Sequence, residues 1–128
     1  MTNDPLVHAF ETATIDPSTF HHREHLFVAW SYLRELPLEQ ALARYVDNLR
    51  RLTIALGVPQ KYHATITWTY VVALHDAMAQ APALDFDELL RARPDLLDHR
   101  TGVLAKHYDR DELDSADARA RFVLPRRR

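Results

Sequence analysis

Residues 20–36, FHHREHLFVAWSYLREL, carry apolar side chains at the three- and four-residue spacing of an amphipathic helix. Leu26 and Leu33 lie on the apolar stripe of this helix, and His22 extends the stripe toward the first turn. Pro37 follows directly and is expected to end the helix, because proline cannot continue it. The segment therefore predicts a long helix that carries histidines in its first turns.

The rest of the chain also has the composition of a helical protein. Gly57 and Gly102 are the only glycines, and no Asn-Gly or Asp-Gly pair is present to close a β-hairpin. Prolines separate the apolar repeats and so mark helix boundaries, while Gly57 and Ser115 are placed to cap helices. The further predicted helices span residues 5–12, 38–56, 62–79, 85–93, 99–108 and 116–124.

These patterns predict an all-α fold: one domain, formed by a bundle of about five to seven helices. The predicted core is the set of three helices over residues 20–36, 38–56 and 62–79, which should pack antiparallel because short connections join them. A chain of 128 residues can bury such a core without a disulfide or a structural metal ion.

Composition argues against several classes of protein. The chain has no cysteine, which removes disulfides, iron–sulfur ligation and thiol chemistry and fits a reducing, cytoplasmic location. A formal net charge of −2 argues against broad attraction to nucleic acid or to anionic lipid. No apolar stretch has the length of a membrane span, and residues 1–13 lack the pattern of a signal peptide.

Three histidines point most directly to chemistry. His22 and His25 are three residues apart, so a helix brings their side chains to one face. His63, in QKYHATITW, falls at the start of the helix predicted over residues 62–79. In an antiparallel bundle this start lies at the same end as the start of the helix over residues 20–36. The three imidazoles are therefore predicted to meet at one end of the core.

Three neutral imidazoles suit a catalytic divalent metal ion, because they leave positions open for water and substrate. Zn, Fe, Cu, Ni and Mn all accept such ligands, and the pattern does not select among them. The metal would polarise a substrate oxygen or activate a bound water. Tyr62 is predicted as a proton donor beside His63, and Thr67, together with Thr65, as a group that orients ligands or substrate. Helix N-termini at this end would favour a polar or anionic small molecule.

Other interpretations of the histidines stay open. His21 and His25 are four residues apart and would serve equally well as a pair of ligands, and His99 or His107 could join the site from later in the chain. The cluster could also work without metal, as a His–Tyr acid–base catalyst of the isomerase or dehydratase type. In a third interpretation the protein binds a small ligand without catalysis, and the histidines are packing elements.

The chain resembles an uncharacterised family of small bacterial all-helical proteins. Their pattern has an aromatic-x-His-x-x-His segment, a Lys-Tyr-His-x-Thr-x-Thr block and a Ser-x-x-Ala-Arg-x-x-Phe segment. In this chain the pattern falls on Phe20, His22 and His25, on Lys61, Tyr62, His63, Thr65 and Thr67, and on Ser115, Ala118, Arg119 and Phe122. The resemblance favours His22 over His21 and pairs the two histidine segments. It implies no activity.

The sequence therefore predicts a small metal-dependent enzyme acting on a small-molecule substrate, with no nucleic-acid or membrane partner. Hydrolytic, lyase and oxidative chemistry are all compatible with these residues. A homodimer formed through a spare apolar helix face is an open alternative for the assembly.

Overall fold

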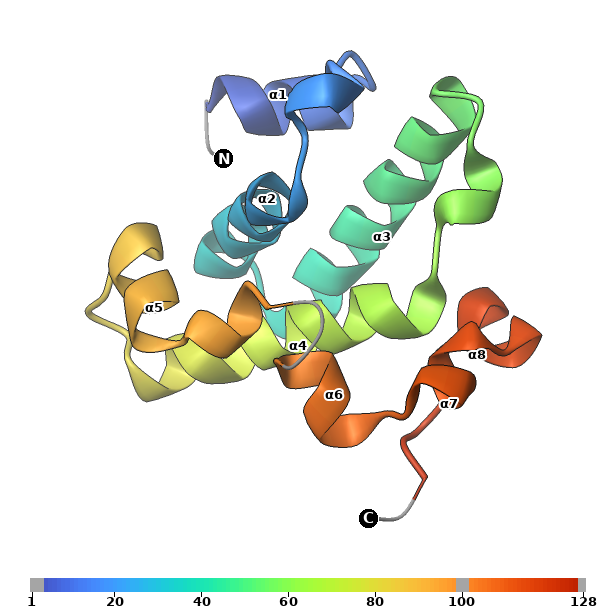
Figure 1. Cartoon of the computed structure of the whole chain (residues 1–128). Coiled ribbons are helices and arrows are strands. Elements are labelled where there is room, and N and C mark those ends of the chain that lie inside the picture. Colours follow the sequence, from blue (N-terminus) through green and yellow to red (C-terminus); the bar gives the residue numbers. More distant parts are fainter. Residues whose placement is uncertain (1–3, 99–101, 127–128) are drawn as a thin grey trace. The chain divides into compact units, whose positions relative to one another are not determined.

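The structure, a computed structural model, describes residues 4–98 and 102–126, and all regular elements in these ranges are helical (Figure 1). The prediction of an all-α fold is confirmed. The chain divides into two compact units, Met1–Tyr62 and His63–Arg128. In the part of the chain described, no helix combines the length and the apolar character needed to cross a bilayer.

The first unit is built from three α-helices. Their bounds, with two short 3-10 turns, are α1 Pro5–Glu11, η1 Pro17–Thr19, α2 His22–Glu35, α3 Leu38–Ala55 and η2 Pro59–Lys61. Helices α2 and α3 pack against each other, and α1 packs on both (Figure 1). Phe10 of α1, Tyr32 of α2 and Leu52 of α3 are buried almost completely, so each helix contributes to the core of this unit.

Polar bonds also join α1 to the other two helices of this unit. The buried Tyr32 hydroxyl donates to the Glu11 carboxylate over 2.6 Å, and the Asn48 amide donates to the Tyr32 oxygen over 3.2 Å. Arg51 donates to the backbone carbonyl of Glu11 over 2.6 Å. Burial and then the Glu11 carboxylate raise the pKa of Tyr32, so its hydroxyl remains a hydrogen-bond donor at neutral pH.

Helices α1 and α3 end in the same way. At α3, the Gly57 N–H bonds to the Ile54 carbonyl over 3.0 Å, and the Val58 N–H bonds to the Thr53 carbonyl over 2.8 Å. This is a Schellman motif, in which Gly57 adopts a left-handed φ of 75°. Residues 9–14 repeat the same two bonds at the end of α1, but there the left-handed residue is Ala13, with φ 56°.

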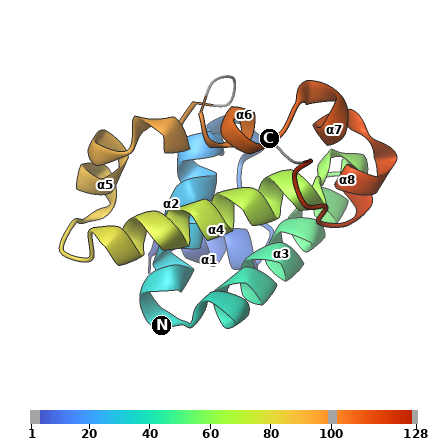
Figure 2. The same cartoon turned by 90° about the horizontal axis from the view of Figure 1, so that it is seen from below.

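The second unit surrounds one long helix with short ones. The bounds are α4 Ala64–Gln80, α5 Phe86–Ala92, η3 Pro94–Leu96, α6 Val103–His107, α7 Arg110–Asp114 and α8 Ala116–Ala120. Helix α4 contacts η3, α6 and α8, which follow one another along it (Figure 2). Thr65, Val71 and Leu74 of α4 are almost completely buried, so α4 supplies the centre of this unit.

Several helix boundaries in the structure differ from the predicted ones. Helix α4 begins at Ala64, so that His63 precedes the first turn rather than lying in it. Within the range predicted as 99–108, only Val103–His107 is observed as helix, and residues 99–101 lie outside the described chain. Helix α7 was not predicted, because five residues are too few to show a helical repeat. Helix α8 ends at Ala120 rather than at residue 124, and an extended segment follows it.

Replacing the left-handed alanine should stabilise the protein. We expect Ala13→Gly to raise the free energy of unfolding by about 0.5–1 kcal/mol, because glycine has no Cβ to oppose a positive φ. Ala43→Gly is the matched control: Ala43 is exposed inside α3, so glycine should cost about 1 kcal/mol there. Urea denaturation measures both changes, and equal destabilisation by the two substitutions would contradict the proposed strain at Ala13.

Candidate functional site

The predicted site residues fall in both units of the chain. His22, His25 and Tyr62 belong to the first unit, and His63 and Thr67 belong to the second. Within residues 4–98 and 102–126, no three side chains of histidine, cysteine, aspartate or glutamate are grouped closely enough to hold a metal ion. The three-histidine metal centre thus gains no support and stays a prediction.

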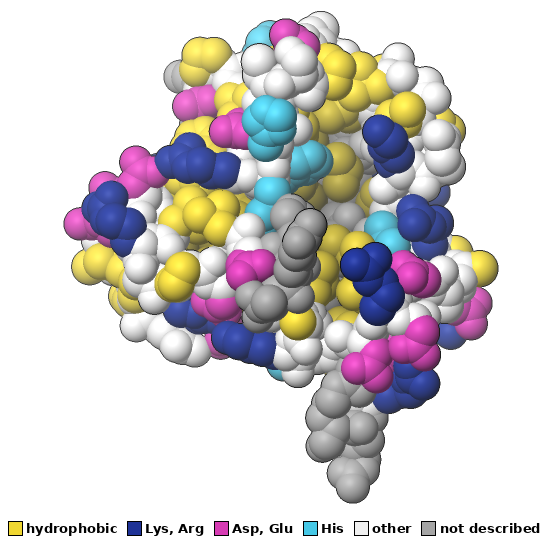
Figure 3. All heavy atoms as spheres, in the orientation of Figure 1, with side chains coloured by type: hydrophobic (Ala, Val, Ile, Leu, Met, Phe, Trp, Pro, Cys, Tyr) yellow, Lys and Arg dark blue, Asp and Glu magenta, His cyan; other side chains and the backbone are white. Residues whose placement is uncertain are grey.

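In the first unit, His25 lies among aromatic side chains. Its Nδ1 atom is 3.0 Å from the Tyr45 hydroxyl oxygen on α3, and its ring centre is 4.1 Å from that of Phe20. Phe10 in turn stacks on Tyr45 with ring centres 5.4 Å apart. His25 is only half-buried, so these aromatic side chains leave part of the imidazole exposed. Figure 3 shows histidine side chains in a column over α1 and the start of α2.

The Tyr45 hydroxyl can form a hydrogen bond with His25 whether or not the Nδ1 atom of the imidazole carries a proton. Burial, with smaller contributions from Tyr32 and Tyr62, raises the pKa of Tyr45 far above neutrality, so the hydroxyl keeps its proton. A hydroxyl can both donate and accept a hydrogen bond. It can therefore donate to an unprotonated Nδ1 of His25 or accept from a protonated one, and the contact is compatible with proton uptake and release by the imidazole.

The start of α2 carries its own negative charge. The Glu24 carboxylate accepts a hydrogen bond from the His21 backbone N–H over 2.9 Å. His21 is exposed, and His22 is half-buried in the first turn. A carboxylate in this position satisfies the helix N-terminus electrostatically, as a bound anion would. The expectation of an anionic ligand therefore finds no support at α2.

His63, in the second unit, binds backbone groups through both ring nitrogens. Its Nδ1 accepts a hydrogen bond from the Ile66 N–H over 3.1 Å, and its Nε2 is 2.6 Å from the Leu113 carbonyl oxygen. The geometry fixes the tautomer, because a backbone N–H can only donate and a carbonyl can only accept: the proton lies on Nε2. His63 is therefore the N-cap of α4, and in this arrangement neither nitrogen offers a lone pair to a metal ion.

Thr67 and Thr65 of the KYHATITW segment also bind backbone groups, and Tyr62 contacts a guanidinium through its ring. The Thr67 hydroxyl donates to the His63 carbonyl over 2.7 Å, within its own helix. Thr65 is fully buried, donates to the Arg121 carbonyl over 3.0 Å and accepts from the Val123 N–H over 3.1 Å. In the first unit, the Arg50 guanidinium lies 5.3 Å from the ring centre of Tyr62. The predicted catalytic roles of Tyr62 and Thr67 stay predictions, and the contacts that we see are structural.

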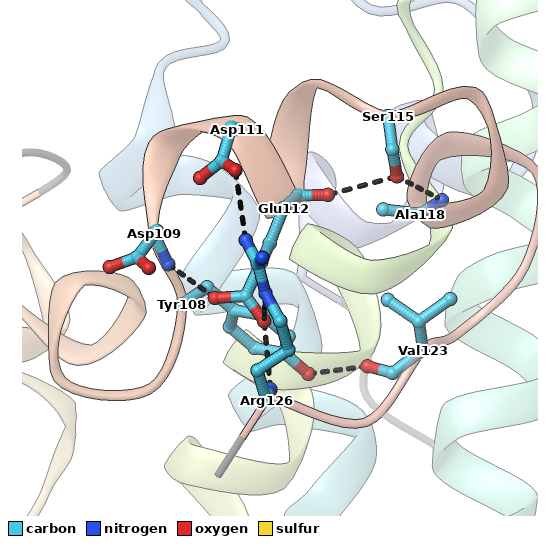
Figure 4. A network of polar contacts seen from close by, with 8 residues as sticks. All are labelled: Tyr108, Asp109, Asp111, Glu112, Ser115, Ala118, Val123 and Arg126. Carbon is cyan, nitrogen blue, oxygen red and sulfur yellow. Dashed lines mark hydrogen bonds and ion pairs between the residues drawn. The ribbon is translucent and has the colours of Figure 1, made fainter. Parts of the chain in front are cut away.

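Two segments far apart in the chain thus meet in the second unit. Trp68 stacks on Phe122 with ring centres 5.5 Å apart, and the Tyr108 hydroxyl donates to the Val123 carbonyl over 2.7 Å (Figure 4). Together with the bonds of Thr65, these contacts attach the residues after α8 to the first half of α4 and to the end of α6. The last two sequence blocks used for the resemblance above are therefore direct structural partners.

Sequence reasoning missed the two partners of the histidines. Tyr45 was assigned to the core, although a helical hairpin that turns at Leu36 and Pro37 brings His25 level with residues near 48, about one turn from Tyr45. That counting could have found the pair. Leu113 offered no signal at all, because its contact is made by a backbone carbonyl, which every residue has.

Comparison of the chain with models of known protein families, with curated proteins and with solved structures finds no match. The resemblance to small bacterial proteins therefore stays a prediction. What can be inferred about function rests on the contacts of His25 and of His63.

Removing the His63 ring should destabilise the second unit. We expect His63→Ala to lower the free energy of unfolding by about 1–3 kcal/mol, since it removes an N-cap and leaves the Leu113 carbonyl without this donor. His63→Asn should recover part of the loss, because asparagine is a good N-cap. Denaturant melts followed by circular dichroism measure both. An unchanged stability of His63→Ala would show that the ring does not cap α4 in solution.

Proposed function

We propose that this protein is a small acid–base enzyme of the isomerase or dehydratase type, with His25 as the group that removes and returns a proton. The observation that carries the proposal is the 3.0 Å contact between His25 Nδ1 and the Tyr45 hydroxyl. Imidazole exchanges protons near neutral pH, and a hydrogen bond to its second nitrogen orients the ring and supports the tautomer change.

The surroundings of His25 support this role. The Phe20 ring covers part of the imidazole, and the buried Tyr45 hydroxyl is a neutral partner beside it. Apolar walls strengthen the polar contacts between a catalytic group and its substrate, because water screens them less. We assign substrate binding to His22, which lies one turn earlier on the same helix and is half-buried.

We propose the substrate class from the groups at the start of α2. The Glu24 carboxylate already interacts with this helix N-terminus, so an anionic ligand would compete with it, and the neighbouring Arg23 guanidinium balances its charge. The proposal therefore takes an uncharged polar small molecule as the substrate, in place of the polar or anionic molecule expected from the sequence. Tyr45 is a positioning residue, since it acts through His25.

A proton-abstraction probe tests the proposal. 5-Nitrobenzisoxazole opens its ring when a base removes one proton, and the product absorbs visible light. We expect the protein to accelerate this reaction above buffer, His25→Ala to lower the rate at least tenfold, and Tyr45→Phe to lower it less while shifting the pH profile. His75→Ala is the matched control, because it removes an exposed imidazole from α4 and should change nothing.

The same assay separates the proposal from the metal hypothesis. Proton transfer by His25 should be unaffected by a chelator and should need no added metal. If EDTA abolished the rate and Zn²⁺ or another divalent ion restored it, the metal-dependent enzyme would be favoured. A rate that persists in His25→Ala at the level of the unmodified protein would rule out His25 as the base.

A further inference from the structure

Residues 121–126, which we call the strap, form an extended segment that is held through its backbone and through the side chains of Phe122 and Arg126. Thr65 bonds to both the Arg121 carbonyl and the Val123 N–H, and Tyr108 bonds to the Val123 carbonyl. The Arg126 N–H then donates to the Glu112 carboxylate over 2.7 Å, as the close-up shows (Figure 4). Each of these bonds uses a main-chain group of the strap. The Arg126 guanidinium adds ion pairs with Asp111 over 2.9 Å and with Glu112 over 3.3 Å.

A ring contact adds selection for an aromatic side chain to these backbone bonds and ion pairs. Phe122 stacks on Trp68 with an angle of 19° between the rings. Thr65 bonds to the residues before and after Phe122, and the Phe122 ring lies against Trp68 of the same helix. Main-chain bonds combined with one side-chain contact are the way in which proteins bind extended peptides.

The strap itself is weakly buried. Phe122 and Val123 are half-buried, and Leu124 is 78% exposed, whereas Thr65 beneath them is 0% exposed. Segments with few buried apolar contacts open more readily than the core of the same domain. The surface under the strap is therefore well formed, and the segment that covers it contributes little burial of its own.

We propose that Thr65, Trp68 and Tyr108 form a binding site for an extended peptide with an aromatic–aliphatic pair of the Phe-Val type, which the strap occupies within the same chain. The covalent link gives the strap a high effective concentration at the site, so an added peptide binds only when the strap is weakened. This binding site lies in the second unit and is independent of His25 and its proton chemistry.

The test uses full-length protein carrying Phe122→Ala and a synthetic peptide with the sequence RARFVLPR of residues 119–126. The indole N–H signal of Trp68 in NMR spectra should shift on titration, with an affinity at least tenfold higher than for the unmodified protein. Leu124→Ala is the matched control, since it truncates an exposed strap residue outside the ring contact and should behave like the unmodified protein. Adding Thr65→Val to Phe122→Ala should abolish binding, as should replacing the phenylalanine of the peptide with alanine.

Two results would overturn the proposal. One is a folded Phe122→Ala protein whose Trp68 signal does not respond to the peptide, or responds equally to the alanine peptide. The other comes from hydrogen exchange in the unmodified protein, which gives an answer even if Phe122→Ala fails to fold. The Val123 N–H should exchange at least a hundredfold faster than that of Leu74 in the middle of α4, and equal rates would mean that the strap does not open separately from the core.

Discussion

The second unit depends on the ring of His63, which joins two backbone groups that lie 47 residues apart in the chain, the N–H of Ile66 and the carbonyl of Leu113. A helix begins with N–H groups that lack partners inside the helix, and a buried one is costly to leave unsatisfied. The ring satisfies one of these groups and fixes α7 against the start of α4 at the same time. Once α4 begins at this point, Thr65 in its first turn faces the residues that follow α8.

The two hydrogen bonds of the His63 ring also limit its ability to bind a metal ion. A metal ligand must present a lone pair, and in His63 one nitrogen lone pair receives an N–H while the other nitrogen carries a proton. Metal binding would require the loss of a helix cap or of the bond to Leu113. The His25 ring has a different kind of partner, because the Tyr45 hydroxyl can donate or accept. Of the two histidine environments, the one at Tyr45 is therefore better suited to proton transfer.

Much of the fold could be predicted from the sequence, since it depends on local patterns. Asp4 before Pro5, Gly57 after α3 and Ser115 before α8 all act as helix boundaries of the kind that their chemistry favours. The site was harder to predict. Spacing places His22 and His25 on one face of a helix, but it says nothing of what each nitrogen binds, and the partners of His63 and Thr65 include backbone groups about 50 or more residues away.

The two histidines that precede helices show how small differences decide the role of such a residue. His21 before α2 and His63 before α4 occupy the same N-cap position. In α2 the third helical residue is Glu24, whose carboxylate reaches back to the N–H of His21, and His21 is exposed. In α4 the third helical residue is Ile66, which has no such group, and the His63 ring turns inward to accept the Ile66 N–H and is 7% exposed. Both histidines therefore occupy N-cap positions, and the third helical residue distinguishes them: Glu24 completes an exposed capping box in α2, whereas Ile66 leaves His63 as the buried cap of α4.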